Sequence, residues 1–137
     1  MATPKNIFML WLDFNKTNQS NLSYKLKMFI NRIHDLHPVD KGWQIFFINN
    51  WDQLYRLINP DKYKWIYNII NNPFVGPAHK SDVIRYFLLY HYGGTWIDAS
   101  TYLVKDLSSL VNNNKGITCF YAPSNLVLSW LFQFSSN

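Results

Sequence analysis

The sequence predicts an α/β fold built on a mainly parallel sheet. Short apolar runs of strand length alternate along the chain with longer segments of helical periodicity. This alternation is typical of strands joined by helical crossovers, which produce parallel strand pairs. With 137 residues, of which 48% are hydrophobic, the chain is large enough to bury a core. No internal repeat or linker divides it, so we expect residues 1–137 to form a single domain.

The first part of the chain reads as strand, loop, helix and strand. A continuous apolar run predicts a strand over 7–12 that is buried on both faces. The polar segment 15–23 predicts a loop. Apolar residues at three- and four-residue spacing predict an amphipathic helix over 22–36, which Pro38 ends. The next apolar run predicts a strand over 43–48.

The middle of the chain predicts helices. Two short ones are expected over 52–58 and 63–70, and a longer one over 79–92. The longer helix stops at Gly93-Gly94, which can adopt the left-handed geometry that reverses a chain sharply. A strand over 95–98 follows. The broad buried face expected of the longer helix consists of Val83, Ile84, Phe87, Leu88 and Tyr90.

The remainder of the chain predicts further extended structure. After a turn at Ala99-Ser100 we expect an extended piece over 101–104, a polar loop over 112–116 and a strand over 117–122. The tail, residues 125–137, contains an apolar segment to which the sequence assigns no element.

Charge and composition narrow the function without fixing it. A formal charge of +5 favours an anionic partner, such as a nucleotide, a phosphosugar, nucleic acid or an acidic membrane. Cations dispersed over the whole chain are equally consistent with a solubilising surface. The longest apolar runs are too short for a signal core or a membrane span, so we expect a cytoplasmic protein without an integral membrane segment. The lone Cys119 excludes an intrachain disulfide and fits a buried, unreactive thiol.

His34 and His37 lie near the predicted end of one helix, where a cation suits the helix dipole. No acidic or thiol partner stands at metal-ligand spacing from them. We therefore expect capping or surface roles for both.

Three charged residues interrupt the apolar pattern in the centre of the chain. Asp82 and Arg85 are three residues apart and share a helix face. Such pairs are common on exposed helices, but the apolar character of this helix predicts burial. Asp98 follows the apolar residues of a strand, at the end where open α/β sheets bind ligands. Its carboxylate suits Mg²⁺ or Mn²⁺, although a turn-capping role fits the spacing equally well.

These residues carry a resemblance to a known group of enzymes. The segment SDVIRYFLLYHYGGTWIDAS resembles the core motif of glycosyltransferases with a DXD motif, and especially of capsular polysaccharide synthesis proteins and their yeast mannosyltransferase relatives. The opening residues Pro4, Lys5 and Trp11 also resemble the first strand of that group, and the resemblance covers about residues 4–111. The shared features are Ser81-Asp82, Arg85-Tyr86, Gly93-Gly94 and Asp98.

The resemblance implies a GT-A-like fold, a nucleotide-binding α/β sandwich, with this chain as its N-terminal, donor-binding part. It implies transfer of a sugar from a UDP- or GDP-linked donor to a glycan or other acceptor in polysaccharide or glycoconjugate synthesis. Ser81, Asp82, Arg85 and Tyr86 would bind the donor, with Asp82 and Arg85 at its ribose and sugar–phosphate region. Trp11 would lie near the base.

The resemblance also implies a catalytic and metal-binding role at the end of the 95–98 strand. Asp98 would bind the donor as the first acid of the DXD motif and act in catalysis with Arg85, because a metal ion and a guanidinium stabilise the charge of a departing diphosphate. Asp98 and Ser100 would hold Mn²⁺ or Mg²⁺. Ser100 stands where the motif has its second Asp, and a neutral hydroxyl is the weaker ligand.

Two other functions compete with this prediction. One is a truncated, non-catalytic relative that only binds a nucleotide sugar. The other is a basic nucleic-acid-binding module, suggested by Tyr and Trp interleaved with cations. The dispersal of Lys and Arg, and the lack of an RNA-binding signature, argue against nucleic acid as a partner.

Overall fold

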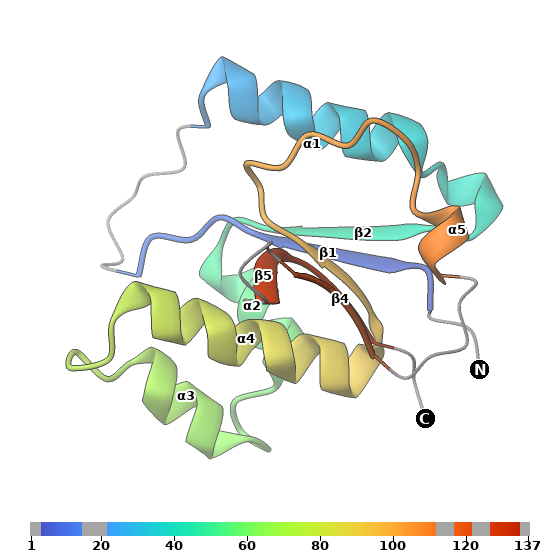
Figure 1. The fold of residues 1–137 in the computed structure, drawn as a ribbon. Coiled ribbons are helices and arrows are strands. Elements are labelled where there is room, and N and C mark those ends of the chain that lie inside the picture. Colours follow the sequence, from blue (N-terminus) through green and yellow to red (C-terminus); the bar gives the residue numbers. More distant parts are fainter. Residues whose placement is uncertain (1–3, 15–21, 112–116, 122–126, 135–137) are drawn as a thin grey trace.

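A computed structural model describes residues 4–14, 22–111, 117–121 and 127–134 (Figure 1). The described elements are β1 (Asn6–Leu10), α1 (Tyr24–Leu36), β2 (Gln44–Ile48), α2 (Trp51–Ile58), α3 (Lys64–Ile70), α4 (Pro77–Tyr92), β3 (Gly94–Ile97), α5 (Ser108–Val111), β4 (Ile117–Tyr121) and β5 (Val127–Phe134), with one 3-10 turn (Val39–Lys41). These bounds agree closely with the strands and helices predicted before β4, apart from α5 and the 3-10 turn, which the sequence did not predict. The predicted loop over 112–116, and all but the end of the loop over 15–23, lie outside the described residues.

One mixed sheet forms the centre of the fold, in the order β2-β1-β3-β5-β4. β1 pairs in parallel with β2 and with β3, so that Phe8 lies opposite Phe46 on one side and Trp96 on the other. This confirms the predicted α/β class with a parallel core. β5 pairs antiparallel with both β3 and β4, and it lies in the tail for which no element was predicted.

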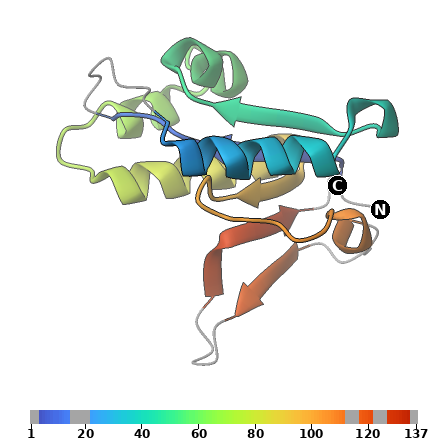
Figure 2. The same ribbon diagram turned by 90° about the horizontal axis from the view of Figure 1, so that it is seen from above.

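Helices cover both faces of the parallel strands: α1 lies on one face, and α2, α3 and α4 lie on the other (Figures 1 and 2). Successive residues of β1 face these two layers in turn, because side chains alternate along a strand. Ile7 and Met9 join the cluster on the α1 side, and Phe8 joins the cluster on the α4 side. All three are fully buried, as predicted for a strand covered on both faces.

Two contacts fix the direction of α4. The Asn6 side chain donates from Nδ2 to the carbonyl oxygens of Tyr92, at 3.3 Å, and Gly93, at 3.2 Å. The last turn of α4 therefore lies beside the start of β1. Gly94 then begins β3 with φ of 128°, and a Cβ on it would lie 2.4 Å from the carbonyl oxygen of Asn6. The N-terminal half of α4 consequently lies at the opposite edge of the sheet, where β1, β2 and β3 end.

One prediction for the middle of the chain is wrong. Tyr90 is 77% exposed, because α4 turns this side chain away from the sheet rather than into the core. The extended piece predicted over 101–104 does not join the sheet. A side chain binds two of its carbonyl groups instead: Arg32 donates to Leu103 O at 3.2 Å and to Val104 O at 3.1 Å, which fastens this segment to α1.

His37 takes the capping role, one of the two expected from the sequence, because it is the C-cap residue of α1, but it does so as a buried residue that is only 1% exposed. Its Nδ1 lies 2.7 Å from Ile33 O, and its Nε2 accepts a hydrogen bond from Leu107 N at 3.0 Å. The imidazole therefore joins the end of α1 to the segment before α5 as a neutral ring protonated on Nδ1. Burial lowers the pKa of His37, chiefly by penalising the charged form.

None of the helices among the described residues combines the length and the apolar composition that crossing a bilayer requires.

Candidate functional site

The predicted site residues gather at one edge of the sheet. β1, β2 and β3 are parallel, so their carboxyl ends share that edge, which is where open α/β sheets bind ligands. Trp11 follows β1 there and is 39% exposed. Its backbone N–H donates to Ile48 O at 2.8 Å, which holds the exit of β1 against the end of β2. Asp98 follows β3 at the same edge.

Asp98 is oriented by its own strand. Trp96 and Asp98 are two residues apart, and the indole Nε1 of Trp96 donates to Oδ1 of Asp98 at 3.1 Å. Trp96 is 2% exposed and packs in the α4-side core, so its ring is fixed. The bond leaves Oδ2 of Asp98 as a second acceptor on a half-buried carboxylate. The backbone carbonyl of Asp98 closes the turn that follows, by accepting from Thr101 N at 3.0 Å.

Asp82 and Arg85 form an ion pair on α4, as their spacing predicted. Arg85 is 5% exposed and its guanidinium lies 5.2 Å from the centre of the Tyr86 ring. The Asp82 side chain is about half exposed, at 49%. A buried guanidinium held by a partly exposed carboxylate differs from an ordinary surface pair, since the cation is desolvated while the anion still faces water.

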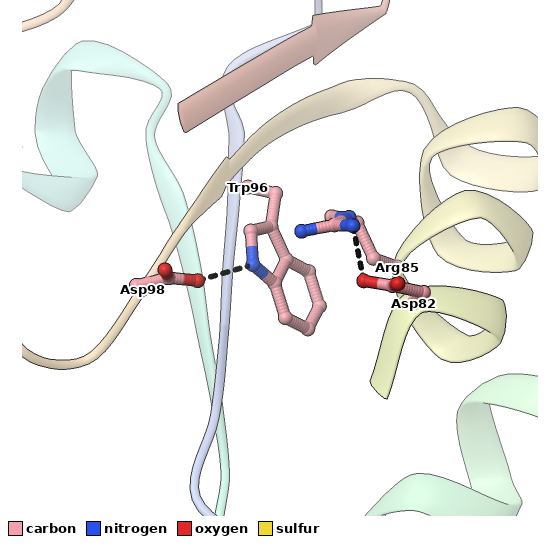
Figure 3. Close-up of polar contacts among 4 residues, drawn as sticks. All are labelled: Asp82, Arg85, Trp96 and Asp98. Carbon is pink, nitrogen blue, oxygen red and sulfur yellow. Dashed lines mark hydrogen bonds and ion pairs between the residues drawn. The ribbon is translucent and has the colours of Figure 1, made fainter. Parts of the chain in front are cut away.

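Figure 3 shows how the Asp82–Arg85 pair on α4 and Asp98 after β3 lie around Trp96. The Trp96 indole lies between the Asp98 carboxylate on one side and the Asp82–Arg85 pair on the other. The sharp reversal at Gly93-Gly94 produces this arrangement, because it folds β3 back along α4.

The other predicted residues lie at different depths. Ser81 is half-buried on α4, and Ser100 is exposed in the turn after Asp98. Tyr86 is 48% exposed. It lines an apolar groove of about 450 Å³ on the outer side of α3 and α4, together with Trp65, Val83, Phe87, Tyr90 and His91. The structure thus brings Asp82, Arg85 and Asp98 together around Trp96, whereas Tyr86 lies partly on a second surface.

No group of three or more His, Cys, Asp or Glu side chains within the described segments could hold a metal ion. The described carboxylates at this edge include Asp98, which Ser100 follows in sequence, Asp13 after β1 and Asp82 on α4. Such a set fits a Mg²⁺ or Mn²⁺ ion carried mainly by substrate phosphates and water, which is how Mg²⁺ is commonly bound.

Sequence reasoning missed Lys80 and the role of Trp96. Lys80 is 6% exposed on the first turns of α4, with its Nζ 5.8 Å from the centre of the Phe14 ring. Helical spacing could have found it, since Lys80 stands four residues before Ile84 and so lies on the apolar face. Trp96 and Asp98 are two residues apart in the predicted strand 95–98, so they share a face, and this spacing could have suggested the Trp96–Asp98 bond.

Comparisons with known proteins agree with this architecture. Residues 2–130 match the family described as capsular polysaccharide synthesis protein. The chain belongs to the capsular polysaccharide synthesis protein family. Inositol phosphoceramide mannosyltransferase 1 of Schizosaccharomyces pombe is 28% identical over 109 residues, which cover 80% of this chain and 31% of the relative.

Two further proteins extend the comparison. Mannosyl phosphorylinositol ceramide synthase SUR1 of Saccharomyces cerevisiae is 36% identical over 64 residues, or 47% of this chain and 15% of the relative. This member of the capsular polysaccharide synthesis protein family thus spans about a third or less of the curated relatives that it matches. The solved PaToxG glycosyltransferase has a TM-score of 0.65 at 18% identity, covering 99% of this chain and 56% of that one. That likeness confirms the fold of a glycosyltransferase.

Proposed function

We propose that residues 1–137 form the donor-binding part of a glycosyltransferase that uses a nucleotide sugar. The observation that carries the proposal is the meeting of Asp98, Asp82 and Arg85 around Trp96 at the carboxyl edge of the parallel strands. The membership of the family, and relatives named as mannosyltransferases, support sugar transfer in the synthesis of a glycan or glycoconjugate. A nucleotide-linked mannose is therefore the first donor to test, with other UDP- and GDP-linked sugars beside it.

Each of the proposed residues contacts a different part of the donor. Trp11, at the exit of β1, offers an exposed ring to the base. The Asp82 carboxylate accepts hydroxyl hydrogen bonds from the ribose or the sugar, while Arg85 holds the sugar–phosphate region. Arg85 is buried beside Asp82, so water screens its attraction to the negative charge that develops on a departing diphosphate less than it would for an exposed cation. Ser81 and Tyr86 flank this pair on α4 and complete the predicted donor set.

Asp98, with Ser100, would hold the divalent ion that the donor carries. When bound, Mg²⁺ or Mn²⁺ neutralises charge on the diphosphate. The chain's own contribution is to hold the Asp98 carboxylate in one orientation through Trp96, so that less ordering is needed when the donor binds. The acceptor, a glycan or a glycoconjugate, and a cytoplasmic location remain predictions beside this one.

The test is a titration of the chain with UDP- and GDP-linked sugars, with and without Mn²⁺, followed by tryptophan fluorescence and melting temperature. A ligand at about 100 times its Kd stabilises the fold by about 2.7 kcal/mol, which is easily measured. We expect Asp98→Ala to abolish the Mn²⁺-dependent part of binding. Asp35→Ala, on the exposed face of α1, is the matched control and should leave binding unchanged.

The outcomes separate the competing functions. Stabilisation by no nucleotide sugar would contradict the proposal. Binding without release or transfer of the sugar would select the non-catalytic relative. Salt-sensitive binding to single-stranded nucleic acid in place of nucleotide sugars would favour the nucleic-acid module.

A further inference from the structure

Lys80 is a buried cation that the proposed donor contacts do not use. It is 6% exposed and its Nζ lies 5.8 Å from the centre of the Phe14 ring. In the described part of the chain the one ion pair joins Arg85 to Asp82, so no described carboxylate neutralises Lys80. A Lys side chain is almost never buried to this degree unless it is paired, and a cation–π contact returns only about 0.5–2 kcal/mol. Such a residue points to an anion that the protein binds.

The position of Lys80 indicates where that anion lies. α4 runs towards the start of β1, so its first turns stand at the carboxyl edge of the parallel strands. Lys80 precedes Arg85 by five residues, which is about 7.5 Å along the helix axis. It is also about 140° away around that axis, because each residue turns the helix by about 100°. The two cations therefore flank the apolar face of α4 from opposite sides.

Lys80 and Arg85 lie near the carboxyl ends of different strands. Arg85 lies beside Trp96, on the β3 side of the edge (Figure 3). Lys80 lies against Phe14, which follows β1 by four residues and packs edge-on against Trp51 at the start of α2. A ligand stretched along the edge from β1 to β3 would therefore meet Lys80 first and Arg85 second.

The helix adds to the attraction. α4 has 16 residues and begins with Pro77, and Lys80 N is the first backbone donor bonded within it, to Gly76 O at 3.1 Å. The N–H groups of the preceding turn point out of the helix end, where the dipole favours negative charge. A helix end and a largely buried lysine without a described ion-pair partner thus lie at one place.

We propose that Lys80 is a phosphate-binding residue of the donor site, which holds the diphosphate on the side of the nucleoside while Arg85 holds it on the side of the sugar. This inference rests on the proposed function, and it deepens that function by assigning a residue to the diphosphate. A structural role for Lys80, limited to packing on Phe14, would predict a loss of stability without a phosphate-specific loss of binding.

The experiment compares ligands with and without phosphates on the full chain. UDP and uridine, and GDP and guanosine, are titrated by calorimetry into wild type, Lys80→Met and Lys80→Arg. Lys80→Met keeps an unbranched apolar stem against Phe14 and removes the charge, whereas Lys80→Arg keeps the charge. Lys64→Met removes an exposed cation at the start of α3 and is the matched control.

We expect Lys80→Met to weaken the binding of UDP or GDP by about 10- to 100-fold, the range for losing one charge-assisted hydrogen bond. The same variant should weaken the binding of the nucleosides by less than about 2-fold. Lys80→Arg should retain most of the affinity for UDP or GDP, and Lys64→Met should bind as wild type does. If Lys80→Met does not fold, as judged by circular dichroism, Lys80→Gln replaces it in the same comparison.

The results distinguish this inference from the function on which it rests. If wild type binds a nucleoside diphosphate and both neutral variants bind it equally well, the assignment of Lys80 is wrong and the donor site stands. An equal loss for nucleoside and diphosphate also overturns the assignment, because it indicates a structural role. If wild type binds neither nucleoside diphosphate, the proposed function and this inference fail together.

Discussion

Replacing Trp96 with Phe tests whether the orientation of Asp98 matters for donor binding. The change removes the indole N–H that donates to Asp98 Oδ1 at 3.1 Å and keeps an aromatic ring in the core. Two costs follow. The core loses contacts around a side chain that is 2% exposed, for about 1–2 kcal/mol of folding free energy, since full truncation of Trp to Ala costs about 3–5 kcal/mol. The Asp98 carboxylate also becomes free to change rotamer.

The second cost, the freedom of Asp98 to change rotamer, is the one that affects donor binding. Immobilising a side chain on binding costs about 0.5–1.5 kcal/mol. We therefore expect Trp96→Phe to weaken the binding of a nucleotide sugar by about 2- to 10-fold, because the bound donor must now order the Asp98 side chain itself. Calorimetry is the suitable assay, since the substitution alters tryptophan fluorescence.

Trp43→Phe is the matched control. Trp43 is also 2% exposed, but it packs on the α1 side of the sheet against His37 and has no contact with the site. It should lose a similar amount of stability and bind donors as wild type does. An equal loss of affinity in the two variants would show that Trp96 acts only through general packing.

A double-mutant cycle then isolates the pair. If Trp96 acts through Asp98, Trp96→Phe should have no further effect on affinity in an Asp98→Ala background. Additive losses in the double variant would refute the coupling.

Two predictions concern the framework. Burial lowers the pKa of His37, so the folded state favours the neutral ring. The contribution of His37 to the free energy of unfolding should therefore be largest above pH 6.5 and should decline as the pH falls below that value. His37→Phe should flatten that decline in urea titrations between pH 7.5 and pH 5, and an unchanged slope would exclude His37 as its source. Gly94→Ala should lower the free energy of unfolding by about 2–4 kcal/mol, and with it the melting temperature by about 8 °C or more. The reason is that an added Cβ would lie 2.4 Å from Asn6 O, at a backbone φ of 128°. Gly76→Ala is its control, since the nearest atom there is 4.0 Å from the added Cβ, and equal melting temperatures would refute the clash.

The local parts of this fold could be predicted from the sequence. The strand and helix bounds up to β3 follow from periodicity, and Gly93-Gly94 marked the reversal that the structure shows. The charged pair on α4 and Asp98 stood out because they interrupt apolar segments. Each of these signals lies within one element or one turn, where spacing alone determines which side chains meet.

What could not be predicted depends on contacts between distant segments. Tyr90 follows the apolar pattern of α4, but whether such a residue is covered depends on what packs over the outer side of the helix. His37 is buried because the segment before α5 returns to it, 70 residues later, and Arg32 holds the carbonyl groups of residues 103 and 104 in place of a strand partner. Neither contact leaves a periodic signal in the sequence.

The site itself combines both kinds of information. Residues 81–98 form a continuous unit in which α4, the glycine reversal and β3 place Arg85 and Asp98 on either side of Trp96. The other side of the edge is supplied by β1, whose exit carries Trp11 and Phe14 and is aligned with β3 through the pairing of Phe8 with Trp96. Gly94 joins the two, because the approach of its backbone to Asn6 sets the distance between β1 and the end of α4. A substitution at Gly94 should therefore change affinity for the whole donor even in variants that still fold, whereas a substitution at Lys80 should act on the nucleoside side of the diphosphate and one at Arg85 on its sugar side.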